Sequence, residues 1–161
     1  MDIECSLADY SDEQHGIDIL ILLKAYALDP MGGGKELSQY ASDNIINELS
    51  KRSDAISIIC YVDGNAAGLV NCFESFSTFK SKPLLNIHDV VVLDKYRGHG
   101  LCQRMLEKVE TIAKERNCCK ITLEVLEGND AAKKAYLKYG FEAYELDPAN
   151  GKALFWQKEL H

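Results

Sequence analysis

The residues best suited to chemistry lie in one stretch, where a run of valines leads into a turn that contains glycine and basic side chains. It reads Val90-Val91-Val92-Leu93-Asp94-Lys95-Tyr96-Arg97-Gly98-His99-Gly100-Leu101-Cys102-Gln103-Arg104. The first amides of a helix lack partners within the helix, and the helix dipole favours an anion there. Glycines at positions 98 and 100 let a phosphate approach the backbone closely. The pattern predicts a pyrophosphate site, against the alternative of a loop that uses two glycines only to turn tightly.

Two common phosphate-binding motifs are excluded. The dinucleotide fingerprint G-x-G-x-x-G fails because Gln103 stands where its third glycine belongs, and no G-x-x-x-x-G-K-[ST] loop occurs. Lys95, Arg97 and Arg104 make the stretch locally basic within a chain that carries 18 basic and 25 acidic residues. His99 either donates to the phosphate or lies in solvent.

The elements that must position this turn alternate between strands and helices. Hydrophobic periodicity predicts helices over residues 11–28, 36–51, 100–115 and 131–139. Strands are expected over residues 2–8, 56–62, 67–76, 84–93, 121–125, 142–146 and 153–159. Ser11 is the expected N-cap of the first helix. The order indicates a mixed α/β fold, with a mostly antiparallel central sheet flanked by helices and one β-α-β crossover.

Composition narrows the class of protein. A length of 161 residues fits a single domain over 1–161, and 47% apolar residues predict a packed core. The net charge of −7 argues against a nucleic-acid partner. No run of about 18 apolar residues occurs, so no membrane span is expected. The start Met1-Asp2-Ile3-Glu4 has no basic region, which predicts no signal peptide and a cytoplasmic location.

The six cysteines show no metal-binding spacing. No two of them form a C-x-x-C pair, so neither a zinc site nor another metal site is expected. Cys5, Cys60 and Cys72 fall in strand-like runs, where a buried free thiol is a small hydrophobic group. A disulfide framework is not expected in a cytoplasmic chain of this size.

A second segment, residues 129–141, indicates which family the glycine-bearing turn belongs to. Asn129 to Phe141 resembles N-x-x-A-x-x-x-Y-x-x-x-G-F, and Arg97-x-x-Gly100-x-Cys102 resembles R/Q-x-x-G-x-G/A, which are two motifs of the GNAT superfamily of acyl-CoA-dependent N-acetyltransferases. The order of elements is similar to the family fold across nearly the whole chain. The resemblance implies an acyl-CoA N-acyltransferase (GNAT) fold with splayed central strands. The chain departs from the pattern at Cys102, where the family has glycine or alanine.

The resemblance also implies where acetyl-CoA, as cosubstrate, would bind. In the family, the strand before the signature splays from its neighbour, and the pantetheine arm pairs with its backbone. Val90, Val91 and Val92 would supply those main-chain bonds. The pyrophosphate would be bound by backbone amides of Arg97, Gly98, His99, Gly100, Leu101, Cys102 and Gln103. Asn129 would hydrogen-bond the coenzyme arm, although it is also a good N-cap by itself.

Acetylation of an amine needs a base. A free alkyl amine has a pKa of about 10, so a side chain or a water relay must take its proton. In enzymes similar to diamine acetyltransferases, a glutamate holds the position of His88, and histidine titrates near neutrality. Asp89 is expected on the opposite sheet face, because side chains alternate along a strand. Glu74 and Glu124 are alternative bases.

The departing thiolate needs an acid, and Tyr136 fits the family position for it. The ordinary pKa of tyrosine, about 10, keeps that hydroxyl protonated at neutral pH. A backbone N–H of Val90 or Val91 would polarise the thioester carbonyl. The acceptor site is expected between the first two helices, with residues 31–35 as a mobile lip beside Tyr26, Asp29 and Tyr40.

Two functions remain in competition. The first is an acetyl-CoA-dependent amine N-acetyltransferase that works by direct attack in a ternary complex. An acidic chain and resemblance to diamine-type enzymes favour a small cationic amine, while a peptide amine stays open. The second is a non-catalytic acyl-CoA-binding regulatory module. It stays an alternative because Cys102 departs from the family motif and because several residues could be the base. A homodimer is expected as a habit of the family.

Overall fold

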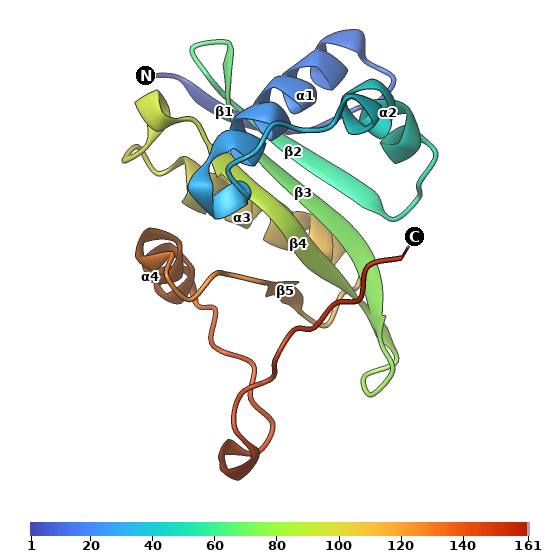
Figure 1. Ribbon diagram of the computed structural model, residues 1–161, viewed down its shortest axis with the longest axis vertical. Coiled ribbons are helices and arrows are strands. Elements are labelled where there is room, and N and C mark those ends of the chain that lie inside the picture. Colours follow the sequence, from blue (N-terminus) through green and yellow to red (C-terminus); the bar gives the residue numbers. More distant parts are fainter. Residues whose placement is uncertain (161) are drawn as a thin grey trace.

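A five-stranded sheet lies between two layers of helices in the computed structural model, which describes residues 1–160 (Figure 1). The strands are β1 (Ile3–Leu7), β2 (Ala55–Val62), β3 (Asn65–Ser77), β4 (Lys82–Val92) and β5 (Ile121–Leu123). They lie side by side in chain order; β1 to β4 pair antiparallel, and β4 and β5 pair parallel. The predicted mixed α/β fold with a mostly antiparallel sheet is confirmed.

Helices cover both faces of the sheet. They are α1 (Glu13–Leu28), α2 (Gln39–Ser50), α3 (Leu101–Glu115) and α4 (Asp130–Tyr139). α1 and α2 lie over one face, α3 lies behind the other, and α4 lies beyond β5 (Figure 1). Three short 3-10 turns occur at Pro30–Gly32, Asp94–Tyr96 and Pro148–Asn150. Among residues 1–160, no helix combines the length and the hydropathy that crossing a membrane requires.

The start of α1 differs from the prediction. Its N-cap is Asp12, whose carboxylate accepts the amide of His15 at 3.1 Å. Ser11 was the wrong residue, because its hydroxyl donates instead to Asp9 at 2.7 Å. α2 begins at Gln39 rather than at residue 36, because the hydroxyl of Ser38 accepts the amide of Ala41 and fixes the first turn there.

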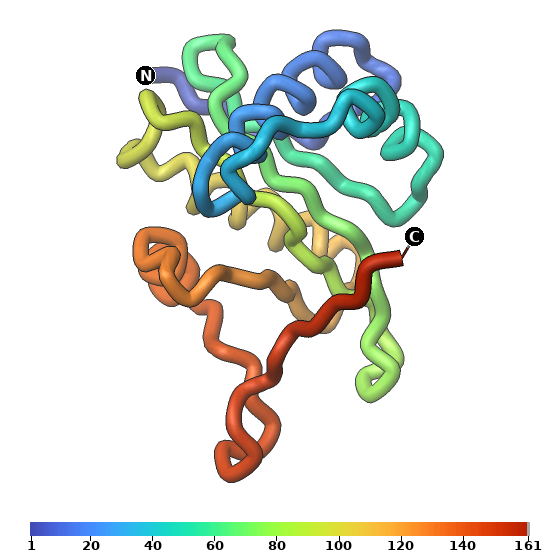
Figure 2. The backbone as a smooth tube through the Cα atoms, in the orientation of Figure 1, coloured from blue at the N-terminus to red at the C-terminus, as the bar shows by residue number. Residues whose placement is uncertain are grey.

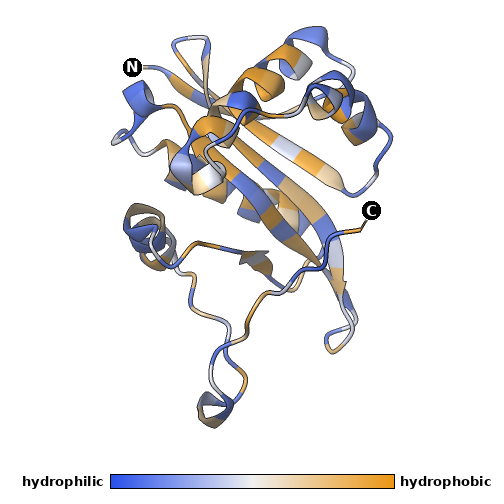
Figure 3. Ribbon diagram, viewed as in Figure 1, coloured by the Kyte–Doolittle hydropathy of each residue, from blue (hydrophilic) through white to orange (hydrophobic). Residues whose placement is uncertain are grey.

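The core has two parts, one on each face of the sheet. The larger part packs the sheet against the apolar side of α3, and the smaller part packs it against α1. Val91 belongs to the α1 side, whereas Val90 and Val92 pack against the α3 side. The valine run of β4 is therefore covered on both faces, as its continuous apolar sequence predicts. Figure 3 shows apolar residues concentrated along the central strands.

The pairing between β4 and β5 is very short. It consists of Leu85 with Ile121, Asn86 with Thr122 and Ile87 with Leu123. β5 ends at Leu123 instead of reaching residue 125, and the chain then leads away from β4 toward α4 (Figure 1). The remainder of β4, up to Val92, has no strand partner on this side within the described residues. The expected splay of the central strands is thus present.

The last two predicted strands, 142–146 and 153–159, are wrong. The chain projects away from the sheet, makes the turn Pro148–Asn150 and returns without strand pairing (Figure 2). Leu146 is 81% exposed and Trp156 is 83% exposed. Alternating hydropathy indicates which side of a strand would be apolar, but a strand forms only where a neighbour accepts its backbone hydrogen bonds. Residues 1–160 offer this segment no such neighbour.

Candidate functional site

The glycine-bearing turn presents free backbone donors. Gly98 and Gly100 adopt left-handed conformations, with φ of 81° and 79°, and a Cβ at either position would meet nothing within 4 Å. α3 begins directly after Gly100, and no side chain caps it. Within residues 1–160, the amides of Gly98 to Gln103 have no recorded acceptor. The turn therefore has the two properties expected of an anion site: free N–H groups and an open approach.

Arg97 plays a different part from its predicted one. Its amide already donates to the carbonyl of Asp94 at 3.2 Å, so it is not one of the free donors. Its guanidinium contacts Asp29 at 3.2 Å and Asp94 at 3.0 Å, and it donates to the carbonyl of Val92 at 3.1 Å. Arg97 thus joins the end of α1, the turn and the last residue of β4.

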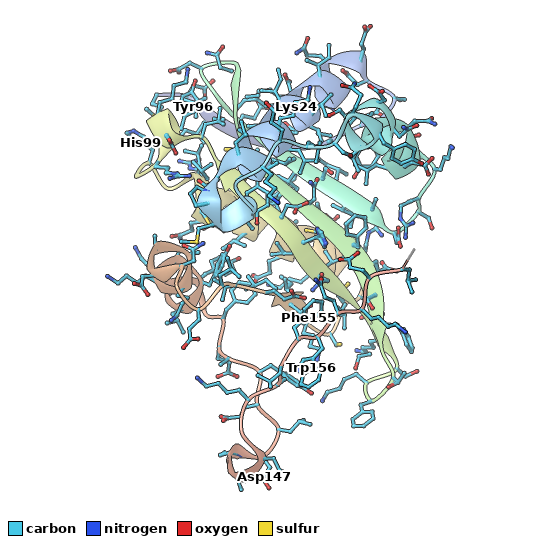
Figure 4. All side chains as sticks on the ribbon, in the orientation of Figure 1. Lys24, Tyr96, His99, Asp147, Phe155 and Trp156 are labelled. Carbon is cyan, nitrogen blue, oxygen red and sulfur yellow. The ribbon has the colours of Figure 1, made fainter. Side chains whose placement is uncertain are left out.

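The other predicted members of the turn divide between core and surface. The side chain of Leu101 is buried in the core, so only its backbone faces the turn. Cys102 is half-buried, and burial raises the pKa of its thiol. Gln103 is exposed and donates to Glu107 at 3.3 Å. His99 lies at the exposed corner of the molecule near Tyr96 (Figure 4).

The register of β4 decides which valine faces the open edge. The amide of Leu93 donates to the carbonyl of Ala67 on β3 at 2.9 Å, and Val91 stands opposite Leu69. Hydrogen bonds alternate along an antiparallel strand, so the backbone of Val91 also points toward β3. The N–H groups of Val90 and Val92 therefore face the side that β5 leaves open. Of the two predicted carbonyl-polarising amides, the geometry favours Val90.

A β-bulge changes the expected alternation at His88. Asn71 stands opposite Asp89, but Cys72 stands opposite Ile87, so His88 is the extra residue. The imidazole and the Asp89 carboxylate consequently meet, with Nδ1 and Oδ1 3.2 Å apart. The prediction that Asp89 points to the opposite face was wrong, because strict alternation holds only without a bulge. The His88 ring also packs edge-on against Phe73, with ring centroids 5.8 Å apart.

Asp89 belongs to a chain of hydrogen bonds on the α1 side of the sheet. Asn71 donates to its carboxylate at 3.1 Å, Ser57 donates to Asn71 at 2.6 Å, and the Tyr10 hydroxyl lies 2.8 Å from that of Ser57. Ser57 and Asn71 are almost fully buried. No motif marks these residues; their only sequence signal is a polar side chain in each of two apolar strands. This series of hydrogen bonds holds the Asp89 carboxylate in place beside His88.

The electrostatics of His88 follow from this contact. The hydrogen bond with Asp89 raises the pKa of His88 above its ordinary value, and Glu124 adds to the effect. The imidazole side chain remains 66% exposed, so solvent can reach it. Glu74, by contrast, pairs with Arg116 at 3.2 Å. The Glu74 carboxylate is thus already bound by a guanidinium, whereas the His88 ring is exposed, which favours His88 as the base.

Tyr136 lies on α4 and packs against the core on the α3 side of the sheet. Its ring is half-buried and packs against Phe141, with centroids 5.9 Å apart. Burial raises the pKa of Tyr136, and Cys102 and Tyr26 add to the rise. The hydroxyl therefore keeps its proton at neutral pH. Within residues 1–160 it has no recorded hydrogen-bond partner.

Asn129 is the N-cap of α4, where its side-chain oxygen accepts the amide of Ala132 at 3.2 Å. This is the structural role that its residue type predicts. Its side-chain NH₂ group is left for another acceptor. Asn129 therefore orients α4, and with it Tyr136, whatever else it binds.

The expected lip is folded against the end of α1. The amides of Gly34 and Lys35 donate to the carbonyls of Asp29 and Ala27, each at 3.0 Å. A Cβ at Gly32 would lie 1.9 Å from the carbonyl oxygen of Tyr26, so only glycine fits there. Burial raises the pKa of Tyr26, with Asp89 and Asp29 as further causes. Two carboxylates thus contribute negative charge near this tyrosine, while Tyr40 is 77% exposed.

A cavity of about 770 Å³ lies between β5, α4 and residues 140–145. Tyr136, Leu123 and Phe141 help to line it, but no residue of the turn or of β4 does. It exists because the chain after Phe141 does not pair with β5. We therefore assign the candidate site to the open edge of β4 and the turn, with Tyr136 between these and the cavity.

Comparisons with known proteins show which family the chain matches. The model of the acetyltransferase (GNAT) family matches residues 21–141. An uncharacterized N-acetyltransferase of Archaeoglobus fulgidus is 35% identical over 89 residues, which are 55% of this chain and 60% of that protein. Glucosamine 6-phosphate N-acetyltransferase 1 of Dictyostelium discoideum is 32% identical over 103 residues, 60% of this chain and 62% of that one. The chain thus matches less than two thirds of either relative.

A solved structure shows the same fold. An aminoglycoside N-acetyltransferase in complex with CoA superposes with a TM-score of 0.77 at 17% identity. The match covers 99% of this chain and 96% of the other.

The contact between His88 and Asp89 makes a prediction for titration. A group that raises a histidine pKa stabilises the charged imidazole, so removing its charge should lower that pKa. We expect NMR titration to place the His88 pKa above 6.5, the ordinary value, and Asp89→Asn to lower it. An unchanged His88 pKa in Asp89→Asn would contradict the contact. Unchanged amide chemical shifts on α3, on the other face of the sheet, serve as the control that Asp89→Asn is folded.

Proposed function

The chain belongs to the acetyltransferase (GNAT) family, and we propose that it transfers the acetyl group of acetyl-CoA to a primary amine by direct attack in a ternary complex. On this proposal, residues 1–161 act as one N-acetyltransferase domain. The observation that carries it is the set of free amides from Gly98 to Gln103 beside the unpaired edge of β4. Acetyl-CoA contains a pyrophosphate, which would bind the free amides, and a pantetheine arm, which would pair with the open edge of β4.

The residues present fit acetyl-CoA. Amides at the start of α3 suit a pyrophosphate, and the space above Gly98 and Gly100 admits it. The N–H groups of Val90 and Val92 suit an extended amide-containing arm, which would add to the sheet as a further strand does. When bound, acetyl-CoA supplies an activated acetyl thioester. Cys102 is compatible with this site because its side chain packs into the core beneath the turn.

The chain's own groups then handle the protons. His88 takes a proton from the attacking amine, directly or through water, and Asp89 stabilises the resulting imidazolium. The N–H of Val90 donates to the carbonyl oxygen as negative charge develops there. Tyr136 gives its proton to the departing sulfur, because its hydroxyl is protonated at neutral pH and has no recorded hydrogen-bond partner within residues 1–160.

A small cationic amine is the acceptor that we propose. Asp89 and Glu124 supply negative charge around Tyr26 and His88, whereas the charge of Asp29 is offset by its ion pair with Arg97. Opposite charge raises the local concentration of a cationic substrate near such a site. The similar glucosamine 6-phosphate and aminoglycoside acetyltransferases are named for small amine substrates. A peptide amine remains the alternative acceptor.

We further propose a homodimer in the cytoplasm. The support for association is the segment after Phe141, on which Phe155 and Trp156 lie exposed (Figure 4). Aromatic side chains on an unpaired segment of the chain are typical of a surface that a second copy covers.

The pyrophosphate assignment predicts that Gly100→Val abolishes binding of acetyl-CoA. The new side chain would enter the space that the phosphate needs, and the left-handed backbone would be strained. Gly64→Val is the matched control, because Gly64 has a φ of 83° and equally open surroundings in the β2–β3 turn. We expect calorimetry to show binding by Gly64→Val but not by folded Gly100→Val. Equal binding of acetyl-CoA by both variants would exclude the turn as the pyrophosphate site.

The acid assignment predicts that Tyr136→Phe lowers kcat by about 100-fold, the usual contribution of a general acid. The affinity for acetyl-CoA should stay near its starting value, because the ring and its packing against Phe141 remain. Tyr139→Phe, one turn away on α4, is the control and should keep its kcat. Thiol release with a panel of amines measures this. Full turnover by Tyr136→Phe would remove Tyr136 from the acid role. A wild-type protein that binds acetyl-CoA but acetylates none of the amines would favour the regulatory module.

A further inference from the structure

We propose that Cys5 and Cys60 form a reversible dithiol–disulfide pair, and that Cys5 is the thiol that reacts first. The two residues stand directly opposite each other on β1 and β2. Their sulfur atoms are 3.1 Å apart. This pair lies on the α3 side of the sheet, away from the His88–Asp89 contact on the α1 side.

The strand register permits a disulfide here. The amide of Asp63 donates to the carbonyl of Asp2, and that of Ala8 donates to Ser57, both at 2.8 Å. Alternation between these two hydrogen-bonded positions makes Cys5 and Cys60 a non-hydrogen-bonded pair. The Cα atoms of such a pair lie about 4.5 Å apart, within the range that a disulfide spans. Closing the sulfur distance to about 2.05 Å needs a shift of about 1 Å.

Charge around Cys5 activates one of the two thiols. A hydrogen bond with Cys60 lowers the pKa of Cys5, and Arg104 and Lys108 on α3 lower it further, while burial and Glu107 act against them. Cys5 is half-buried and opens into a cavity of about 270 Å³ that the side chains of Arg104, Glu107 and Lys108 also line. Cys60 is fully buried, and its contact with Cys5 raises its pKa. Cys5 is thus the more accessible partner with the lowered pKa, and Cys60 is the buried partner with the raised pKa.

The oxidant class is a small anionic disulfide, of which oxidised glutathione is the example, because Arg104 and Lys108 place positive charge beside Cys5. The Cys5 thiolate attacks one sulfur of that disulfide, forms a mixed disulfide and releases one glutathione thiolate. Cys60 then attacks the sulfur of Cys5, the mixed disulfide breaks, and a second glutathione thiolate leaves. The two thiol protons of the protein end on the two released glutathiones. The protein pair is oxidised by two electrons and the reagent disulfide is reduced by the same two.

The other cysteines provide an internal comparison. Cys72 is buried without a thiol partner, and burial raises its pKa to about 12. Cys118 and Cys119 are half-buried neighbours in sequence beyond the end of α3. Within residues 1–160, the Cys5–Cys60 contact is the one recorded between two sulfurs. Selective oxidation at this pair, with the remaining thiols left reduced, is therefore the signature of the proposal.

To test this, the full reduced chain is treated with oxidised glutathione and its remaining free thiols are alkylated with N-ethylmaleimide. The peptides are then mapped by mass spectrometry. We expect one cross-linked peptide pair, Cys5 with Cys60, and four alkylated cysteines, since the chain has six. Dithiothreitol should restore both thiols. Because the cross-link closes a long loop, the oxidised wild type should melt about 5–10 °C higher than the reduced form.

Two variants separate the roles of the thiols. Cys60→Ala should stop at a mixed disulfide between Cys5 and glutathione, whereas Cys5→Ala should leave Cys60 alkylated or unreacted but never glutathionylated. Cys119→Ala is the matched control and should form the Cys5–Cys60 link as the wild type does. Six alkylated cysteines in treated wild type, or a cross-link through any other pair, would overturn the proposal even if a variant fails to fold. Neither result depends on coenzyme binding or turnover.

Discussion

The early end of the pairing between β4 and β5 is the constraint on which the rest of the structure depends. Beyond Ile87, the outer edge of β4 has backbone groups that no strand within residues 1–160 bonds. A backbone donor in such a place needs a partner, and a ligand with amide groups can provide one. The turn after β4 then starts α3 with further unbonded amides, so two sets of donors lie along one continuous stretch of chain. Arg97 holds them together through Val92 and Asp29.

The bulge at His88 gives the same strand a second function. It shifts the backbone by one residue, so that Leu85 bonds toward β5 while Val91 stands in register with β3. It also brings His88 and Asp89 to one side, where buried Asn71 steadies the carboxylate. A regular strand would separate these two side chains. One inserted residue therefore places the proposed base and aligns the open edge.

Much of this could be predicted from the sequence, because the signals are local. Glycine at positions 98 and 100, the valine run and the capping residues Asn129 and Gly140 all act over a few neighbours. The side of Asp89 could not be predicted, since a bulge depends on the partner strand and not on the residue itself. The pairing of Arg97 with Asp29 joins positions far apart in the chain and leaves no local pattern. The prediction of strands within residues 142–160 was wrong for the same reason, because hydrophobic periodicity describes a strand but not the neighbour that must pair with it.

Hydrogen–deuterium exchange with and without acetyl-CoA tests whether the coenzyme bonds to these free donors, because it measures the backbone amides themselves. We expect slowed exchange at Val90, Val92 and the amides of 98–103 when the coenzyme is present, with the β2–β3 hairpin unchanged. Protection limited to the cavity between β5 and α4, or no protection at saturating coenzyme, would contradict the assignment of these free donors to the coenzyme site.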